Sequence, residues 1–241
     1  MVNLSVNVNK IATLRNARGR NLPNVLLESQ KIIDFGGQGI TVHPRPDGRH
    51  IRWPDVVELK GSIKVELNIE GYPENHFLEK VGQIAPAQCT LVPDPPEVLT
   101  SNAGWRVTGN EIFLEKTVKK LKDKDIRVSL FIDPHEIKMK ELLSLRDMGV
   151  DRVELYTEAY ADGFKEGRQE EVIKAYQRCA QESDSMGMKI NAGHDLNLDN
   201  LSYFAKSIPE LAEVSIGQAL VCDALSYGWQ ETIKRYLNCL K

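Results

Sequence analysis

The segment Gly39–His50 concentrates side chains that can move protons and bind anions. A short run rich in β-branched residues, Gly39–Val42, is followed within eight residues by His43, Arg45, Arg49 and His50. Histidine titrates near neutral pH, and the arginine guanidinium donates paired hydrogen bonds to phosphate or carboxylate oxygens. Two prolines and a glycine in the same stretch exclude a helix. We therefore expect either a strand that ends in an active-site wall or a solvated basic loop.

The elements that must position this segment are visible as eight short apolar runs. Most runs are continuous rather than alternating, which is typical of strands buried on both faces. Amphipathic segments with helix end signals lie between them. The expected strands are Leu4–Val8, Gly39–His43, Ile63–Ile69, Cys89–Val92, Ile126–Ile132, Arg152–Tyr156, Met188–Ala192 and Glu213–Gly217. The expected helices include Val25–Phe35 capped by Asn24, Glu111–Lys122, His135–Met148, Glu170–Met186 and Ala219–Leu240.

Strand–helix alternation repeated eight times predicts an α/β fold, a single (β/α)8 TIM barrel over residues 1–241. A doubly wound open sheet is the alternative. Such a sheet favours a phosphate loop after its first strand, and the chain has no GxGxxG or Walker pattern.

In a barrel, the C-terminal ends of all strands meet at one mouth. A carboxylate such as Glu70 at the end of an apolar strand is costly unless it is paired or exchanges a proton. Gly193 permits close approach of His194, whereas the direction of Glu154 depends on strand register. Three roles remain open for Lys10: a lysine that forms a Schiff base, a residue that binds phosphate, or a solvated residue at a strand end. The polar residues at the expected strand ends are Asn7, Asn9, Lys10, His43, Arg45, Glu70, Thr100, Glu154, His194, Asp195, Gly217 and Gln218.

Several groups at this mouth suit anionic ligands. Arg15 and Arg18 follow the first strand, and we expect one to pair with a structural acid while the other faces a ligand. Glycines after the last two strands can offer backbone N–H groups to phosphate. The chemistry indicates a barrel enzyme acting on phosphorylated metabolites, with a glutamate and two histidines as acid–base groups. No metal is required, because no HxH pair or facial triad is present.

Composition narrows the class of protein further. The formal net charge of −3 gives no basic field for nucleic acid. No apolar run has membrane-spanning length, and the first residues lack the pattern of a secretory signal. The four cysteines are far apart, which argues against a disulfide framework or a zinc site and fits reduced thiols in the cytoplasm.

These segments resemble the pyridoxine 5′-phosphate synthase family, in order and spacing through nearly the whole chain. Ile11–Gly19, Gly39–His50 and the Asn-Ala-Gly-His motif at residues 191–194 are specific to the family, and the other matching segments are supportive. The matching segments are Ile11–Gly19, Gly39–His50, Asn68–Glu70, Leu91–Pro93, Val128–Asp133, Asn191–His194 and Ser215–Gly217.

The resemblance implies condensation of 3-amino-1-hydroxyacetone 1-phosphate with 1-deoxy-D-xylulose 5-phosphate to give pyridoxine 5′-phosphate, phosphate and water in vitamin B6 biosynthesis. It implies proton acceptors at His43 and Glu70, a proton donor at His194, and stabilisation of a charged intermediate by Glu154. It also implies a lid at about 94–110, homo-oligomers up to octamers, and no cofactor or metal. The amino-ketone phosphate site would comprise Asn7, Arg18, Asp195, Gly217 and Gln218, and the sugar phosphate site Asn9, Lys10, Arg45, His50 and Thr100.

Five positions depart from the family pattern. Asn9-Lys10 stands where Asp-His is usual, and Arg106 lies where an acid is common, so that lid closure is expected to differ. Gln218 replaces a histidine and cannot carry a full positive charge, which predicts weaker phosphate binding. Asp195 replaces a glycine; we expect it to cap the next helix near Asn197 or to pair with a base.

Two rival functions remain open at this point. One is a Schiff-base aldolase that uses Lys10, and the other is a diverged, non-catalytic barrel that binds sugar phosphates. The presence of His43, Glu70 and His194 together favours the synthase.

Overall fold

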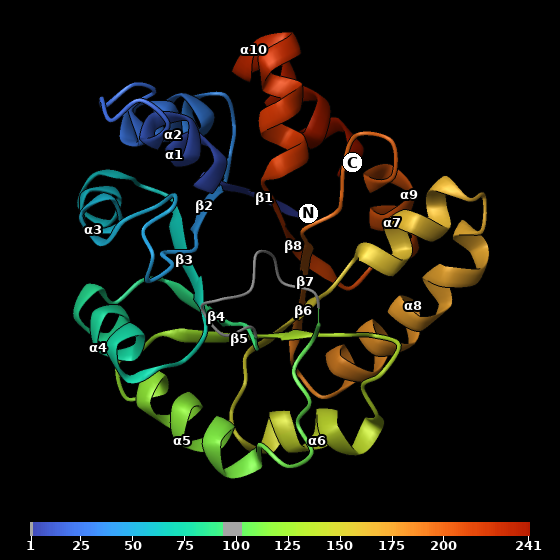
Figure 1. Cartoon of the computed structure of the whole chain (residues 1–241). Coiled ribbons are helices and arrows are strands. Elements are labelled where there is room, and N and C mark those ends of the chain that lie inside the picture. Colours follow the sequence, from blue (N-terminus) through green and yellow to red (C-terminus); the bar gives the residue numbers. More distant parts are fainter. Residues whose placement is uncertain (1, 94–102) are drawn as a thin grey trace.

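The computed structural model describes residues 2–93 and 103–241, and these form a closed barrel of eight parallel strands in the order β1 to β8 (Figure 1). Each strand pairs with the next along the chain, and β8 closes the barrel onto β1. The predicted TIM barrel is therefore confirmed, and the open-sheet alternative is wrong. The strands are β1 (Asn3–Asn7), β2 (Gly39–Val42), β3 (Glu66–Gly71), β4 (Gln88–Leu91), β5 (Arg127–Ile132), β6 (Arg152–Leu155), β7 (Lys189–Gly193) and β8 (Leu211–Ile216).

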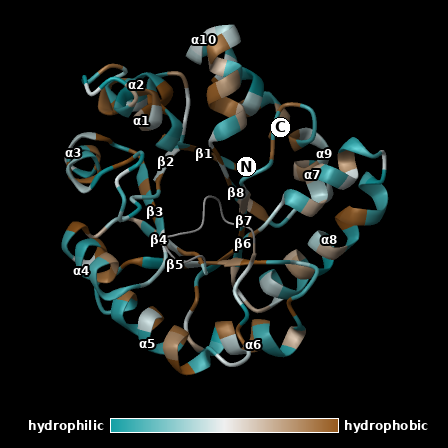
Figure 2. Ribbon diagram, viewed as in Figure 1, coloured by the Kyte–Doolittle hydropathy of each residue, from teal (hydrophilic) through white to brown (hydrophobic). Residues whose placement is uncertain are grey.

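Helices surround the barrel, and Figure 2 shows hydrophobic and hydrophilic residues alternating along their turns. Such amphipathic helices bury one face against the strands. Among the described residues, no helix is both long and apolar enough to cross a membrane. The helices are α1 (Asn9–Asn16), α2 (Val25–Asp34), α3 (Trp53–Ser62), α4 (Asn75–Ile84), α5 (Glu111–Lys122), α6 (Met139–Asp147), α7 (Glu158–Lys165), α8 (Gln169–Ser185), α9 (Leu201–Ser207) and α10 (Gln218–Cys239).

The expected helices match these bounds with two exceptions. α2 has the predicted cap, since the Asn24 side chain accepts a hydrogen bond from the Leu27 N–H. The helix expected from His135 begins only at Met139, because residues 133–138 form a turn that Asp133 closes by accepting from the Ile137 N–H. α10 is broken at Gly228, whose φ of 72° and ψ of 161° are not helical.

The strands alternate between apolar and polar faces, contrary to the expectation of apolar residues on both. In β3, Leu67 and Ile69 belong to the hydrophobic core, whereas Asn68 lies in a side-chain hydrogen-bond network. That network crosses the barrel, because Thr90 of β4 bonds both Asn68 and Glu154 of β6. Side chains on a strand alternate in direction, so one register places a polar set inside the barrel and an apolar set against the helices.

Candidate active site

A cavity of about 590 Å³ opens at the C-terminal ends of the strands and gathers twelve of the fourteen predicted site residues. Contributions come from both ends of the chain, from β1 to the start of α10, so the barrel closure itself assembles the cavity. The predicted residues that line it are Asn7, Asn9, Lys10, His43, Arg45, His50, Glu70, Glu154, His194, Asp195, Gly217 and Gln218.

The two remaining predicted residues are not in this lining. Arg18 is exposed just beyond the end of α1 and does not contribute to the cavity wall. Thr100 lies outside the described residues, as does most of the expected lid segment.

His43 and Glu70 face each other on one side of the cavity. His43 Nδ1 lies 3.9 Å from Glu70 Oε2, and Asn7 donates a hydrogen bond of 3.4 Å to the same carboxylate oxygen. The side chain of Asn9 accepts from the His43 backbone N–H at 3.0 Å, so it fixes the end of β2 where the catalytic candidate sits. Asn9 thus has a direct structural contact with His43, which sequence reasoning did not anticipate.

Burial sets the charge state of this pair. Desolvation, followed by the positive charge of Arg45, lowers the pKa of His43 well below its usual value. Desolvation, followed by the charge of Glu154, raises the pKa of Glu70 well above its usual value. His43 is therefore a neutral imidazole at physiological pH, which leaves a ring nitrogen free to accept a proton.

Glu154 points into the cavity from β6 and completes a pair of interacting carboxyls with Glu70. Thr90 donates a hydrogen bond to Glu154 Oε2 at 3.3 Å. Desolvation and the nearby charge of Glu213 raise the pKa of Glu154 to about 7. Two buried carboxyls that influence each other share their titration, so a proton remains near the pair around neutral pH.

His194 lies across the cavity in an unusual backbone conformation. Its φ of 63° is in the left-handed region, and Asp195 Oδ2 lies 2.8 Å from its Nδ1. Burial alone lowers the pKa of His194, but the hydrogen bond and charge of Asp195 outweigh that effect and raise it. Unlike His43, His194 is thus adapted to hold a proton and donate it.

The loop that carries His194 is held by Thr157, the N-cap residue of α7, and by close packing against β8. Thr157 donates to the Gly193 carbonyl and accepts from the Asp195 N–H. A Cβ at position 193 would lie 2.2 Å from the Ser215 carbonyl oxygen, so glycine is needed here for the close packing of the end of β7 against β8. Of the two roles expected for Asp195, pairing with a base is confirmed and capping is wrong, because the N-cap of α9 is Asn200.

The basic side of the cavity is organised by the end of α1. Arg15 forms an ion pair of 2.5 Å with Asp55, as expected for one of the two arginines after the first strand. The Asn16 side chain donates to the His50 carbonyl at 2.8 Å and also contacts two further carbonyls of the same loop. These contacts position the loop that presents Arg45 and Arg49.

The backbone N–H of the next residue orients the His50 ring within this loop. Its Nδ1 accepts from the Ile51 N–H at 2.9 Å, so the proton of the neutral ring lies on Nε2. Desolvation and the charges of Arg45 and Arg49 lower the pKa of His50 to about 4. His50 therefore acts as a neutral hydrogen-bond donor rather than as a cation at physiological pH.

The opposite side of the cavity ends at the start of α10. Gly217 precedes this helix, and Gln218 is its first residue. The first backbone N–H groups of a helix have no partner within it and carry partial positive charge. The Gln218 side chain contacts Cys222 Sγ at 3.3 Å along the helix.

Sequence reasoning missed several residues that line the cavity. Glu158 is the first residue of α7 and Thr13 lies in the second turn of α1, and both helices follow strands; Arg49 was recognised only as part of the basic segment. Their place after a strand end is the signal that identifies them. Glu158 and Ser215 are polar residues at expected strand ends that were not included among the predicted site residues. The lining residues outside that predicted set are Thr13, Arg49, Val92, Phe131, Glu158 and Ser215. Within residues 2–93 and 103–241, no three His, Cys, Asp or Glu side chains are grouped to hold a metal ion.

Known proteins resemble this chain in both fold and sequence. Among solved structures, the tryptophan synthase α-subunit of Pyrococcus furiosus matches 98% of this chain and 97% of its own with a TM-score of 0.63 at 13% identity. Phosphoribosylanthranilate isomerase of Thermotoga maritima matches 100% and 98% with a TM-score of 0.60 at 12% identity. At these identities the two structures support the barrel fold alone.

Curated relatives are much closer in sequence. Pyridoxine 5′-phosphate synthase of Parabacteroides distasonis is 52% identical over 240 residues, covering 100% of this chain and 99% of the relative. The protein of the same name from Cytophaga hutchinsonii is 50% identical over 241 residues, with full coverage of both. A family profile described as pyridoxal phosphate biosynthesis protein PdxJ matches residues 4–241. The chain therefore belongs to the PdxJ family of pyridoxal phosphate biosynthesis proteins.

Proposed function

We propose that this chain is a pyridoxine 5′-phosphate synthase that condenses 3-amino-1-hydroxyacetone 1-phosphate with 1-deoxy-D-xylulose 5-phosphate. The observation that carries the proposal is the gathering of His43, Glu70, Glu154 and His194 around one cavity. Imine formation, dehydration and ring closure each move protons, and these four side chains differ in the charge they hold at neutral pH. Groups held at different charge states can act as acid and base in the same turnover.

The two phosphate groups are assigned to opposite sides of the cavity. The sugar phosphate lies on the basic side, near Lys10, Arg45 and His50, with Thr100 added from outside the described residues. The amino-ketone phosphate lies near Asn7 and the start of α10, where Gly217 and Gln218 offer backbone N–H groups. Arg18 belongs to this second group by family resemblance.

The proton steps follow from the charge states. His43 is neutral and accepts a proton, and Glu70 accepts one after ionisation, when its raised pKa makes it a strong base. His194 donates a proton to a leaving hydroxyl or phosphate oxygen. Glu154, once ionised, stabilises positive charge on the imine nitrogen of the intermediate.

Asp195 acts through His194 in this scheme rather than through substrate phosphate. Its carboxylate would repel a phosphate, and it is already bonded to the imidazole. We assign it the role of holding His194 in position and protonated.

Removing the Asp195 charge will move the pH profile of the enzyme. In Asp195→Asn the pKa of His194 falls, so the proton donor is lost at a lower pH and the alkaline limb of kcat shifts downward. At pH 8 we expect kcat to fall roughly tenfold, which is less than the fall expected if the proton donor His194 itself were removed. Steady-state kinetics from pH 6 to 9 measure this; a uniform loss at every pH would contradict it. Asp195→Glu, which restores a carboxylate, is the matched rescue.

A histidine in place of Gln218 will tighten phosphate binding. Gln218 is neutral at the start of α10, whereas an imidazolium there adds a charge-assisted hydrogen bond. In Gln218→His the KM of one phosphate substrate will fall about 3-fold at pH 6.5, and the gain will fade at pH 8.5 as the imidazole loses its proton. Gln218→Asn is the neutral control, and an unchanged KM in Gln218→His at both pH values would show that the side chain does not face phosphate.

The reaction itself is tested by mixing the two substrates with purified protein. The product is a pyridine ring, which absorbs in the near ultraviolet, whereas neither substrate is aromatic. Appearance of this chromophore with release of one phosphate supports the synthase. Borohydride trapping of a substrate on Lys10 would instead indicate a Schiff-base aldolase.

We also propose that residues 1–241 make up one domain that works in the cytoplasm, without a cofactor or metal, as a homo-oligomer. Exposed apolar side chains on the contacting helices α1, α2 and α10 support the oligomer; they are Leu14, Leu27, Leu225 and Tyr227. Leu225→Asp will lower the molar mass measured by light scattering, because a buried charge is costly at an interface. An unchanged mass would remove α10 from the contact.

A further inference from the structure

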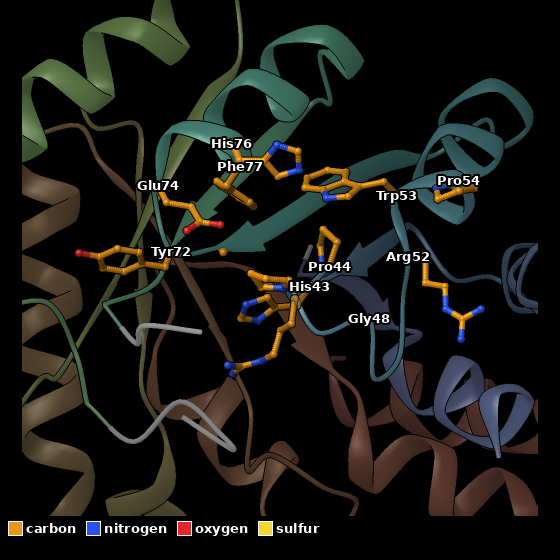
Figure 3. Close-up of a pocket in the computed structure, with 13 residues that line it drawn as sticks. His43, Pro44, Gly48, Arg52, Trp53, Pro54, Tyr72, Glu74, His76 and Phe77 are labelled. Atoms are coloured by element: carbon orange, nitrogen blue, oxygen red, sulfur yellow. The ribbon is translucent and has the colours of Figure 1, made fainter. Parts of the chain in front are cut away.

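A second cavity of about 350 Å³ lies beside the active site, between the loop after β2 and the loop after β3 (Figure 3). Its wall includes the rings of Trp53, at the start of α3, and of His76 and Phe77, in the first turn of α4. The Trp53 ring meets His76 edge-on at 6.4 Å and meets Phe77 at 6.1 Å. Pro44 and Pro54 add further flat, apolar surface.

Close packing at the end of β3 shapes this cavity. A Cβ at Gly71 would lie 2.2 Å from the Phe77 ring, so only a glycine lets that ring lie against the strand. A larger residue at position 71 would push Phe77 into the cavity. Trp53 and His76 also point toward one another above it in Figure 3.

Charged groups of both signs stand at the edges of the second cavity. Glu74 extends toward its centre in Figure 3, and Arg52 forms part of the opposite rim. His43 and Arg45 line this cavity as well as the active site, so the two cavities share a wall.

This combination selects a flat aromatic ligand that carries both a cationic nitrogen and an anion. The volume lies in the range of small-molecule sites. An aromatic ring would stack or pack against Trp53 and Phe77. A protonated ring nitrogen would pair with the Glu74 carboxylate, and a phosphate would pair with the guanidinium group of Arg45 or Arg52. An aliphatic phosphate would leave the aromatic surface without a matching partner. A pyridine ring bearing a phosphate ester has all the required groups.

We propose that the second cavity binds pyridoxine 5′-phosphate, the product, and that its occupancy slows turnover through the shared wall of His43 and Arg45. The inference rests on the proposed function, because that function makes this molecule next to the cavity. Product bound there contacts the far side of two active-site residues. Substrate cannot displace it, so inhibition persists at saturating substrate.

The test uses pyridoxine 5′-phosphate as the probe, with calorimetry and initial-rate kinetics on the full chain. The wild-type protein is expected to bind two molecules per chain and to show mixed inhibition. Trp53→Leu is expected to bind one and to show purely competitive inhibition, with kcat in the absence of product unchanged. Trp229→Leu is the matched control, because Trp229 lies on α10 and bonds Glu28 away from both cavities; it keeps both sites.

Glu74→Gln provides a second variant that preserves side-chain shape. It is expected to weaken the second binding event about 5-fold or more without changing the first. A single site in the wild type, or two sites of unchanged affinity in both Trp53→Leu and Glu74→Gln, would overturn the inference. Failure of the proposed function has a different signature, since no pyridine chromophore would form from the two substrates in any variant.

Discussion

His43→Asn and Glu70→Gln will each abolish pyridine ring formation while leaving the barrel folded. Both substitutions preserve approximate size and hydrogen-bonding capacity, but neither new side chain can accept a proton at neutral pH. General-base catalysis by one residue typically contributes 10²–10⁴-fold, so we expect a loss of kcat of about 10³-fold in each variant. Initial rates followed by product absorbance measure the loss.

The same substitution at an exposed histidine separates chemistry from folding. His135→Asn changes a side chain that is exposed and outside the active-site cavity, and we expect its kcat to match that of the wild type. Circular dichroism and thermal melting report whether His43→Asn and Glu70→Gln remain folded. Turnover within about twofold of the wild type in either folded variant would remove that residue from the mechanism.

Glu154→Gln will inactivate the enzyme and stabilise it at the same time. The pKa of Glu154 is raised from 4.5 to about 7, chiefly by burial, so the folded chain binds its proton more tightly than the unfolded chain does. Stability therefore declines as pH rises from about 4.5 to about 7 and stays lower above that. A shift of this size corresponds to about 3 kcal/mol at most, and glutamine never ionises.

The pH dependence is the decisive measurement for this variant. At pH 8, Glu154→Gln is expected to have a free energy of unfolding up to about 3 kcal/mol higher than the wild type, while at pH 4 the two will agree. Glu115→Gln, at an exposed position of α5, is the control and should change stability by less than about 0.5 kcal/mol. A destabilised Glu154→Gln at pH 8 would mean that the carboxylate is more strongly stabilised by its neighbours than its burial indicates.

The opposing effects at Glu154 show why the barrel interior is built from polar residues. Thr90 and Asn68 form a hydrogen-bonded path that ends on this carboxyl, so the side chain is held in one place despite the cost of burial. Positioning of this kind is typical of sites where function is favoured over stability.

Much of the architecture was accessible from local sequence signals. Strand–helix alternation predicted the barrel, and positions at the expected strand ends predicted eleven of the cavity-lining residues; His50 was predicted from the basic segment after the second strand. The helix cap at Asn24 was also predictable, because an N-cap bond depends only on residues close in the sequence, here Asn24 and Leu27. The late start of α6 and the break of α10 at Gly228 were missed, because apolar periodicity continues through both segments.

The sequence by itself determined which side chains stand at strand ends, because parallel strands of a barrel present those ends on one side. Only the tertiary structure decided which partners they meet. Glu154 faces Thr90, 64 residues away, because the register directs it inward, and a slip of one residue would turn it outward. Likewise, the opposite proton affinities of His43 and His194 arise from burial and from neighbours such as Arg45 and Asp195, and these depend on how the closed barrel brings charges together.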